Sequence, residues 1–426
     1  MPEAGQAIGF NSFNPPSLWF FLTDFLCAIV FIGASYPKLL IMKYSTKVSL
    51  GLFSVVAVLG LMALTNKPTP KKPAQQKIQA AILLDVSNSM DGLIEQAKAQ
   101  LWNMVSTMGK AQCSNNTTPQ IEIALYEYGR SSNDVKDGYV KKINGFISDL
   151  DSLSQNLFKL TTNGGDEYCG QVIYTSLKEL NWDAAPENYK VIFIAGNEDF
   201  LQGNLLYTKA CAEAKDKGVI VNTIYCGDRM QGIREHWNLS AECGNGSFTN
   251  INQDAKIEDI PTPYDSLLFS YNDKLNGTYL TYGTNRVYFS ANQATQDRLN
   301  TSMSKTAGIK RIKAKSNAKV YNNAQWDLVD AKEKDGEGAL AKIDKNILPD
   351  TLKNKTNEEL EKIVSEKAKE RGIVQKEIAQ LNTQRDAYIA AERVKNAANK
   401  NNVATMESEV EKIIKEQAKR FKMVIQ

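Results

Sequence analysis

Three oxygen-bearing side chains alternate in the segment Asp85-Val-Ser87-Asn-Ser89, which directly follows an apolar run over 78–84. The run is typical of a buried strand, and open parallel sheets bind their ligands at the carboxyl ends of such strands. Side chains at alternating positions can point into a single cavity. One carboxylate and two hydroxyls suit a hard divalent cation, Mg²⁺ first and Ca²⁺ or Mn²⁺ next. Because only one of the three groups is charged, the ion would attract a further acid, which a partner protein could supply.

The elements around this loop alternate between strand and helix patterns. Short apolar runs, typical of buried strands, alternate along the chain with segments that have helical spacing. The predicted strands include 78–84, 121–126, 190–195 and 219–225, and the predicted helices include 92–108, 150–160, 168–180 and 205–217. Such alternation predicts an α/β fold with a doubly wound, mostly parallel sheet covered on both faces.

Four segments carry a family resemblance. They are Ile-Gln-Ala-Ala-Ile-Leu-Leu-Asp-Val-Ser-Asn-Ser-Met-Asp-Gly (78–92), Thr-Thr-Asn-Gly-Gly-Asp-Glu-Tyr-Cys-Gly (161–170), Val-Ile-Phe-Ile-Ala-Gly-Asn-Glu (191–198) and 237–248 with its two glycines. In this order they resemble the first strand and metal loop, the second metal loop, the third strand-end loop, and the final helix, turn and strand of a von Willebrand factor A (vWA) domain. The resemblance spans Lys77 to Asn252 and is to domains with a metal-ion-dependent adhesion site, of the bacterial envelope type.

The second and third loops depart from the usual family pattern. The family usually has a Thr in the second loop and an Asp in the third, where this chain has Asp166-Glu167 and Asn197. The resemblance implies that Asp85, Ser87, Ser89 and either Asp166 or Glu167 lie near the metal, with Asn197 behind them or bound through water. Exchanging Asp for Asn removes one negative charge and the acidic second loop restores one. The alternative is a metal-free domain in which Asp85 only caps the following helix.

Other chemistry has less support in the sequence. The single histidine, His236, excludes two-imidazole mechanisms and is expected to be a partly buried structural residue. Gly164-Gly165 could cradle a phosphate, but the two acids that come next repel anions. Asp166 and Glu167 could act as general acid and base, yet no nucleophile or sugar-binding aromatic motif accompanies them. We therefore expect no enzymatic activity, no catalytic residue and no organic cofactor.

Composition sets the outer bounds. A length of 426 residues favours two or three domains, and 42% apolar with 23% charged residues excludes a wholly disordered chain and a polytopic transporter. The net charge is only +3, so nothing in the overall field indicates a nucleic-acid partner.

The N-terminal part predicts a membrane connection. The stretch 48–65 has no charged residue and is preceded by the basic head Met42-Lys-Tyr-Ser-Thr-Lys, which is the layout of a secretory signal or a signal anchor. We divide this part into an uncertain extension with an apolar segment (1–41), a signal peptide or membrane anchor (42–66) and a stiff linker (67–77). The rest of the chain is then expected outside the cytoplasm, in the periplasm or at the surface.

The rest divides into a vWA-like domain (78–256), an irregular linker region (257–350) and a helical tail (351–426). Within the linker region, 264–275 has a helical pattern, whereas 281–325 is expected to be extended. In the tail, apolar residues fall at heptad-like positions from Leu360 to Tyr388, with Lys367, Arg371 and Arg385 at the remaining ones. This pattern predicts a helix that packs on its own chain or on a partner protein, or that self-associates as a coiled coil.

Five cysteines lie in the part that is expected to fold. Their odd number leaves the pairing open, with Cys169 and Cys226 near the rim of the sheet, Cys211 as an alternative mate, and buried free thiols as a further alternative.

The first functional hypothesis is a membrane-anchored or secreted, adhesion-type module that binds a partner's carboxylate through a metal. The second is an adaptor for a motor ATPase, because the family includes chelatase-type members that work in the cytoplasm. A hydrolase is a third and weaker hypothesis.

Overall fold

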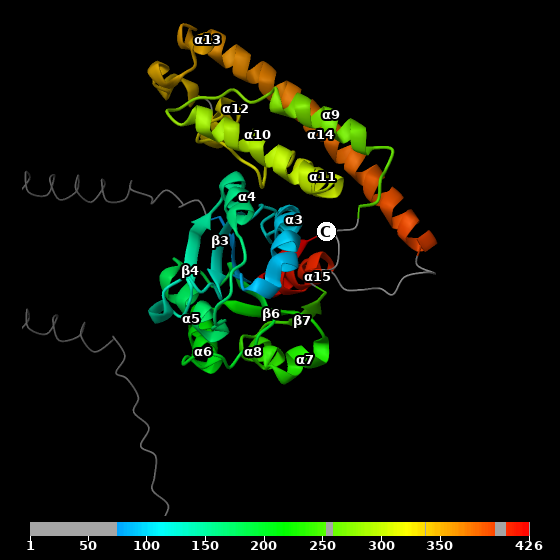
Figure 1. The fold of residues 1–426 in the computed structure, drawn as a ribbon. Coiled ribbons are helices and arrows are strands. Elements are labelled where there is room, and N and C mark those ends of the chain that lie inside the picture. Colours follow the sequence, from blue (N-terminus) through cyan, green and yellow to red (C-terminus); the bar gives the residue numbers. More distant parts are fainter. Residues whose placement is uncertain (1–74, 253–258, 337, 397–405, 426) are drawn as a thin grey trace, which may run out of the picture. The chain divides into compact units, whose positions relative to one another are not determined.

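A six-stranded sheet forms the centre of the α/β part of the chain (Figure 1). The computed structural model describes residues 75–252, 259–336, 338–396 and 406–425. Neighbouring strands follow the order β4-β3-β1-β5-β6-β7, and all pair in parallel except β4, which is antiparallel to β3. The strands are β1 (Lys77–Asp85), β3 (Gln120–Tyr128), β4 (Lys141–Ile147), β5 (Tyr189–Gly196), β6 (Ile220–Cys226) and β7 (Phe248–Ile251). The predicted doubly wound, mostly parallel sheet is thus confirmed.

Helices cover both faces of this sheet (Figure 1). Ile82 and Leu84 of β1 pack into the core on one face, and Ala81 and Leu83 pack into the core on the other. Because both faces are buried, the strand reads in the sequence as a continuous apolar run. The first face is covered by α3 (Asp91–Met108), α4 (Leu150–Lys159) and α15 (Met406–Ala418), and the second by α5 (Cys169–Glu179), α6 (Tyr207–Lys217) and α8 (Trp237–Cys243).

The C-terminal helix α15 belongs to the α/β layer although it comes last in the chain. Its apolar residues Val410, Ile413 and Ile414 pack into the same core as α3. The Gln417 side chain accepts a hydrogen bond from the Tyr189 hydroxyl of β5 at 2.9 Å. The short strand β8 (Val424–Ile425) then pairs with β2 (Ala111–Gln112). The α/β unit therefore does not end near residue 256, and the helices between β7 and α15 form an insertion into it.

The region 281–325, expected to be extended, is mostly helical. The expected helix at 264–275 is present as α9 (Asp265–Asn276). The insertion contains further helices, which are α10 (Arg286–Met303), α11 (Lys305–Lys315), α12 (Leu328–Asp335), the 3-10 turns η3 (Leu340–Lys342) and η4 (Lys345–Ile347), and α13 (Asp350–Lys353). The expectation of an irregular linker at 257–350 was wrong because it relied on apolar periodicity.

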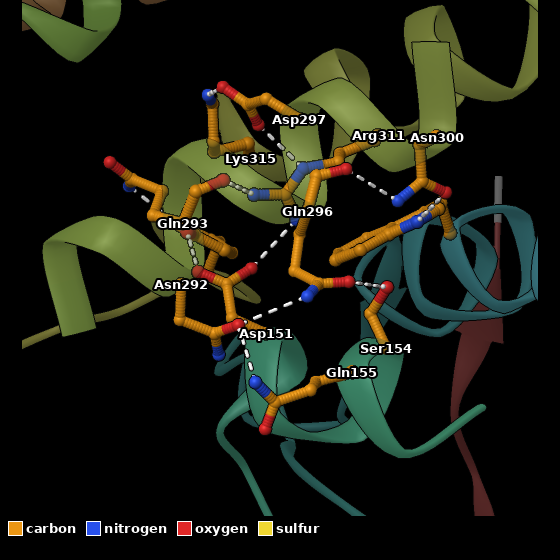
Figure 2. A network of polar contacts seen from close by, with 12 residues as sticks. Asp151, Ser154, Gln155, Asn292, Gln293, Gln296, Asp297, Asn300, Arg311 and Lys315 are labelled. Carbon is orange, nitrogen blue, oxygen red and sulfur yellow. Dashed lines mark hydrogen bonds and ion pairs between the residues drawn. The ribbon is translucent and has the colours of Figure 1, made fainter. Parts of the chain in front are cut away.

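The buried face of α10 and α11 is polar, as Figure 2 shows. The Arg311 side chain is 0% exposed and donates to Asp151 Oδ1 of α4 at 2.7 Å and to Asp297 Oδ1 of α10 at 2.6 Å. Lys315 Nζ donates to the other oxygen of Asp297 at 2.6 Å. Ser154 of α4 donates to Gln296 Oε1 at 2.9 Å. Since hydrogen bonds and ion pairs satisfy this face, its burial requires no apolar stripe.

The long helix α14 (Asn357–Asn396) packs on its own chain. It begins with the capping box Thr356–Glu359, in which each residue's backbone N–H donates to the other's side chain, at 2.8 and 3.2 Å. Arg371 at the heptad-like seam donates to Asp327 and Asp330, both at 2.7 Å, and Arg385 donates to Asp265 at 3.0 Å. The seam is therefore occupied by the helices of the insertion, and the coiled-coil expectation is not confirmed.

The structure decides among the open cysteine alternatives: Cys169 and Cys226 are buried free thiols, one of the expected possibilities, and Cys211 pairs with Cys243, which was not expected. A disulfide joins Cys211 of α6 to Cys243 of α8, with 5.7 Å between their Cα atoms. Cys113, Cys169 and Cys226 are free and buried. Cys169 and Cys226 cannot pair because they belong to the cores on opposite faces of the sheet.

The elements predicted for the N-terminal part stay predictions. The extension 1–41, the signal or anchor at 42–66 and most of the linker 67–77 lie outside the described residues. In the part of the chain that the structure describes, no helix combines the length and apolar character that crossing a bilayer requires.

The buried ion-pair network gives a stability prediction. Replacing Arg311→Ala leaves the buried Asp151 carboxylate without its cation, while Asp297 keeps Lys315. The free energy of unfolding should therefore fall by about 3–5 kcal/mol. Arg298→Ala, on the exposed face of α10, is the control and should change it by about 0.5 kcal/mol or less. Urea unfolding followed by circular dichroism measures both, and equal stability of the two variants would contradict this role of the network.

Candidate metal centre

Asp85, the last residue of β1, lies in a cradle between two glycines. The strands next to β1 in the sheet are β3 and β5. Gly129 directly follows the last residue of β3, and Gly196 is the last residue of β5. A Cβ atom at Gly196 would lie 3.0 Å from Asp85 Oδ2 and 2.5 Å from the Tyr128 hydroxyl, and one at Gly129 would lie 3.0 Å from Asp85 Oδ1. Both positions therefore exclude larger residues, which keeps the carboxylate at the sheet edge between them.

One oxygen of the Asp85 carboxylate has no partner. Oδ1 accepts a hydrogen bond from the Ser87 backbone N–H at 2.8 Å, whereas Oδ2 is buried and unpaired among the described residues. Burial, only partly opposed by the hydrogen bonds from Ser87, raises the pKa of Asp85 to about 6. A buried carboxylate oxygen without a donor is a position that a cation can satisfy. The donor set at this edge thus fits a divalent ion.

The two serines lie together beside this carboxylate. Ser87 Oγ and Ser89 Oγ are 3.3 Å apart. The Asn197 amide nitrogen, from the loop after β5, donates to Ser89 Oγ at 3.3 Å. Ser87 is buried and Ser89 is exposed, so the hydroxyls lead from the cradle to the surface. The structure therefore brings Ser87, Ser89 and Asn197 together, as expected for these three residues.

Asp85 does not cap the following helix. Its side chain accepts from the N–H of Ser87, and the 3-10 turn η1 (Asn88–Met90) that leads into α3 starts one residue later, with no side-chain capping bond. The alternative in which Asp85 serves only as a helix cap is therefore not what the hydrogen bonds show.

The second loop places Glu167, rather than Asp166, next to Asp85. Glu167 is 7% exposed, and a Cβ at Gly129 would lie 2.9 Å from its Cγ and 3.0 Å from Asp85 Oδ1. Asp166 is exposed and accepts a hydrogen bond from the Tyr168 hydroxyl at 3.3 Å. Two backbone bonds fix the loop, from Asn163 N to Val86 O at 2.8 Å and from Ser131 N to Gly164 O at 2.7 Å.

Among the residues with described positions, no Lys or Arg neutralises the carboxylates at this edge. Burial, together with the negative charges of Asp85, Glu198 and Asp166, raises the pKa of Glu167 to about 8. In the described ranges, none of these four acids forms an ion pair with Lys or Arg. Gln202 bridges two of them, accepting from the Glu167 N–H at 3.1 Å and donating to Glu198 at 3.3 Å. Bound divalent charge would relieve this repulsion.

Sequence reasoning did not include Glu198 in the ligand set. The sequence feature that could have identified Glu198 is its position directly after Asn197 in the third strand-end loop. The Trp237 indole donates to the Glu198 carbonyl at 2.7 Å, and His236 beside it contacts Asp199 Oδ1 at 3.1 Å, so the only histidine helps to hold this loop. Among the residues with assigned positions, no group of three or more His, Cys, Asp or Glu side chains could hold a metal ion. The set found at this edge contains one central carboxylate and two hydroxyls.

The raised pKa of Asp85 gives a pH prediction for the metal-free protein. The pKa rises from 3.8 to about 6 on folding, so the ionised form opposes folding. Stability from this group is fully present below about pH 4, is lost as the pH rises toward 6, and then stays constant; the loss corresponds to about 3 kcal/mol. Asp85→Asn should therefore be more stable than the parent at pH 7.5 in chelator, with a much smaller difference at pH 4. Urea unfolding at both pH values measures it, and a difference that does not depend on pH would contradict the assignment.

Comparisons with known proteins give structural likeness only. No protein-family model matches the chain, and no curated protein matches its sequence. An aerotolerance-related membrane protein from Bacteroides fragilis NCTC 9343 is similar at 15% identity and a TM-score of 0.30, covering 42% of this chain and 93% of its own. BatB from Bacteroides thetaiotaomicron is similar at 15% identity and a TM-score of 0.31, covering 54% and 99%. Proximal thread matrix protein 1 from the mussel byssus, with a zinc-occupied MIDAS motif, also has 15% identity and a TM-score of 0.31, covering 41% and 42%.

At these scores the fold assignment rests on the chain's own topology. The strand order, the helices on both faces and the Asp-x-Ser-x-Ser loop at the carboxyl edge of β1 agree with the resemblance found in the sequence. The α/β part of this chain therefore has the fold of a von Willebrand factor A domain.

Proposed function

We propose that the cradle at the end of β1 binds a divalent cation, Mg²⁺ or alternatively Ca²⁺ or Mn²⁺, and thereby engages a carboxylate of a partner protein. The observation that carries the proposal is the buried, unpartnered Oδ2 of Asp85 beside the paired hydroxyls of Ser87 and Ser89. When bound, such an ion supplies a Lewis-acidic position that a carboxylate oxygen from another protein can fill.

The residues of the cradle have separate tasks in this proposal. Asp85 provides the central negative charge, and the two serine hydroxyls provide neutral oxygens. Asn197 orients Ser89 through its amide. Glu167 lies next to Asp85 and adds negative charge. Because its side chain is buried, it does not face the partner. The low count of charged ligands favours an external acid as the last ligand.

We also propose a binding module rather than an enzyme. The side chains gathered at this edge are acids, hydroxyls and amides, and each has a role in holding a cation. The candidate general acid–base pair is split, because Glu167 is buried while Asp166 faces the surface.

An envelope location is part of the same proposal. The basic head and apolar stretch of 42–66 support a signal or anchor. The disulfide between Cys211 and Cys243 supports an oxidising compartment, because such bonds persist mainly outside the cytoplasm. The membrane would then be contacted only through the N-terminal segment, and the metal edge would face a protein partner.

Topology separates this proposal from the cytoplasmic adaptor for a motor ATPase. The segment 42–66 should export the chain that is C-terminal to it. A reporter that is active only outside the cytoplasm should therefore be active when it is fused after residue 70, and a reporter that is active only in the cytoplasm should not. Paired alkaline phosphatase and fluorescent-protein fusions measure this. Activity restricted to the cytoplasmic reporter would favour the adaptor.

Metal binding is tested by a matched pair of variants. Isothermal titration calorimetry of the full-length protein should give one Mg²⁺ site, and Asp85→Ala should weaken it by at least about tenfold, since even supporting residues of metal sites have effects of this size. Asp216→Ala, which removes an exposed acid of α6, is the control and should bind as the parent does. Thermal unfolding with and without Mg²⁺ should show stabilisation only where binding is retained. Unchanged Mg²⁺ affinity in the Asp85 variant would refute the proposed site.

A further inference from the structure

A basic groove lies beside the metal loop. It has a volume of about 500 Å³ and runs between the start of β4 and the end of α4. Its lining includes four cationic side chains and one acid, which are Arg130, Lys141, Lys142, Lys159 and Glu127. No aromatic residue is among the lining side chains.

The positive charge of the groove exceeds what its own acid can neutralise. Glu127 is 3% exposed and already accepts from Arg130 Nε at 3.1 Å. Lys141 is 60% exposed and only 3.8 Å from the same carboxylate. Lys142 pairs with Glu179 at 3.1 Å, while Lys159 is exposed and has no ion pair within the described ranges. Two positive charges therefore remain in surplus, carried by two different elements that face one groove.

The groove borders two loops of the candidate metal centre, because Arg130 and Thr161 are among its lining residues. Arg130 directly follows Gly129, where a Cβ atom would lie 3.0 Å from Asp85 Oδ1. The Arg130 guanidinium donates to the Thr161 carbonyl at the start of the second metal loop. The neighbouring Ser131 N–H donates to the Gly164 carbonyl of that loop at 2.7 Å. A segment seated in the groove thus contacts the loops that follow β3 and α4, which also border the cradle.

We propose that this groove holds an acidic segment of the same protein partner whose carboxylate reaches the metal. The inference rests on the proposed function and adds the chemistry of the partner, which is several carboxylates in one stretch, at least one for the metal and others for Lys141 and Lys159. A protein segment fits better than a nucleic acid, because single-stranded nucleic-acid sites combine cations with aromatic stacking platforms and this lining has none.

The test uses a fluorescently labelled decapeptide of glutamate and the full-length protein. Fluorescence anisotropy with Mg²⁺ should show binding that weakens as NaCl rises from 0.1 to 0.5 M, since exposed charges are screened. Lys141→Glu and Lys159→Glu should each weaken binding by about fivefold, and the double variant should weaken it further than either alone, because both residues line the groove. Lys305→Glu, an equal charge change on the exposed start of α11, should leave binding unchanged.

The outcomes separate the groove from the metal. If chelator weakens binding and the charge reversals do not, the groove proposal is overturned while the metal proposal stands. Binding that depends on Lys141 and Lys159 but is unaffected by chelator supports the groove and counts against the metal. No binding of the glutamate peptide, or tighter binding of an oligothymidine of equal length, overturns the acidic protein segment as occupant.

Discussion

The structure around the end of β1 depends on one constraint, a buried carboxylate with an unsatisfied oxygen. Asp85 is fully buried, and only one of its two oxygens accepts a hydrogen bond from a residue that the structure describes. Burying such a group costs free energy unless a cation or a donor satisfies it. The neighbouring positions fit this need, because Gly129 and Gly196 let the backbone approach the carboxylate closely. Within the described ranges, no Lys or Arg forms an ion pair with Asp85. The residues that fold the edge are thus not optimised for stability in the absence of an ion.

The second carboxylate sharpens the same constraint. Glu167 lies beside Asp85, and its pKa is raised to about 8 by burial and by the surrounding acids. If the neighbouring carboxylates of Asp85 and Glu167 were both ionised, they would repel each other. The metal-free edge therefore favours a protonated Glu167 near neutral pH. The fold tolerates this because the loop carrying Glu167 is held by backbone bonds to Val86 and Ser131 rather than by the carboxylate itself. The rigid backbone therefore holds Asp85 and Glu167 next to each other, although two free carboxylates would move apart.

The sequence was sufficient wherever burial is apolar and local. The buried strands and the Asp85 loop follow from continuous apolar runs that end in oxygen-bearing residues, so the doubly wound sheet and the meeting of Asp85, Ser87 and Ser89 could be predicted. The place of Asn197 beside them was implied by the family resemblance. The helices α10 and α11 could not, because Arg311 and Asp297 bury a polar face whose partners are distant in sequence. Periodicity does not reveal which way a side chain points in a loop, so it could not decide whether Asp166 or Glu167 lies next to Asp85. The disulfide could not be predicted either, because it depends on which face of the sheet each cysteine occupies.

Electrostatic contrast at this edge bears on how a partner would be selected. A cation in the cradle attracts any accessible carboxylate, so the ion alone discriminates poorly among proteins. The groove that starts at Arg130 has the opposite sign from the acids around Asp85, and the two regions are joined by the loop contact between Ser131 and Gly164. Charges outside the point of coordination affect association rate and register more than they affect affinity. Specificity would then come from the spacing between the metal-bound acid and the acids that meet Lys141 and Lys159, a distance set by the rigid ends of β3, β4 and α4.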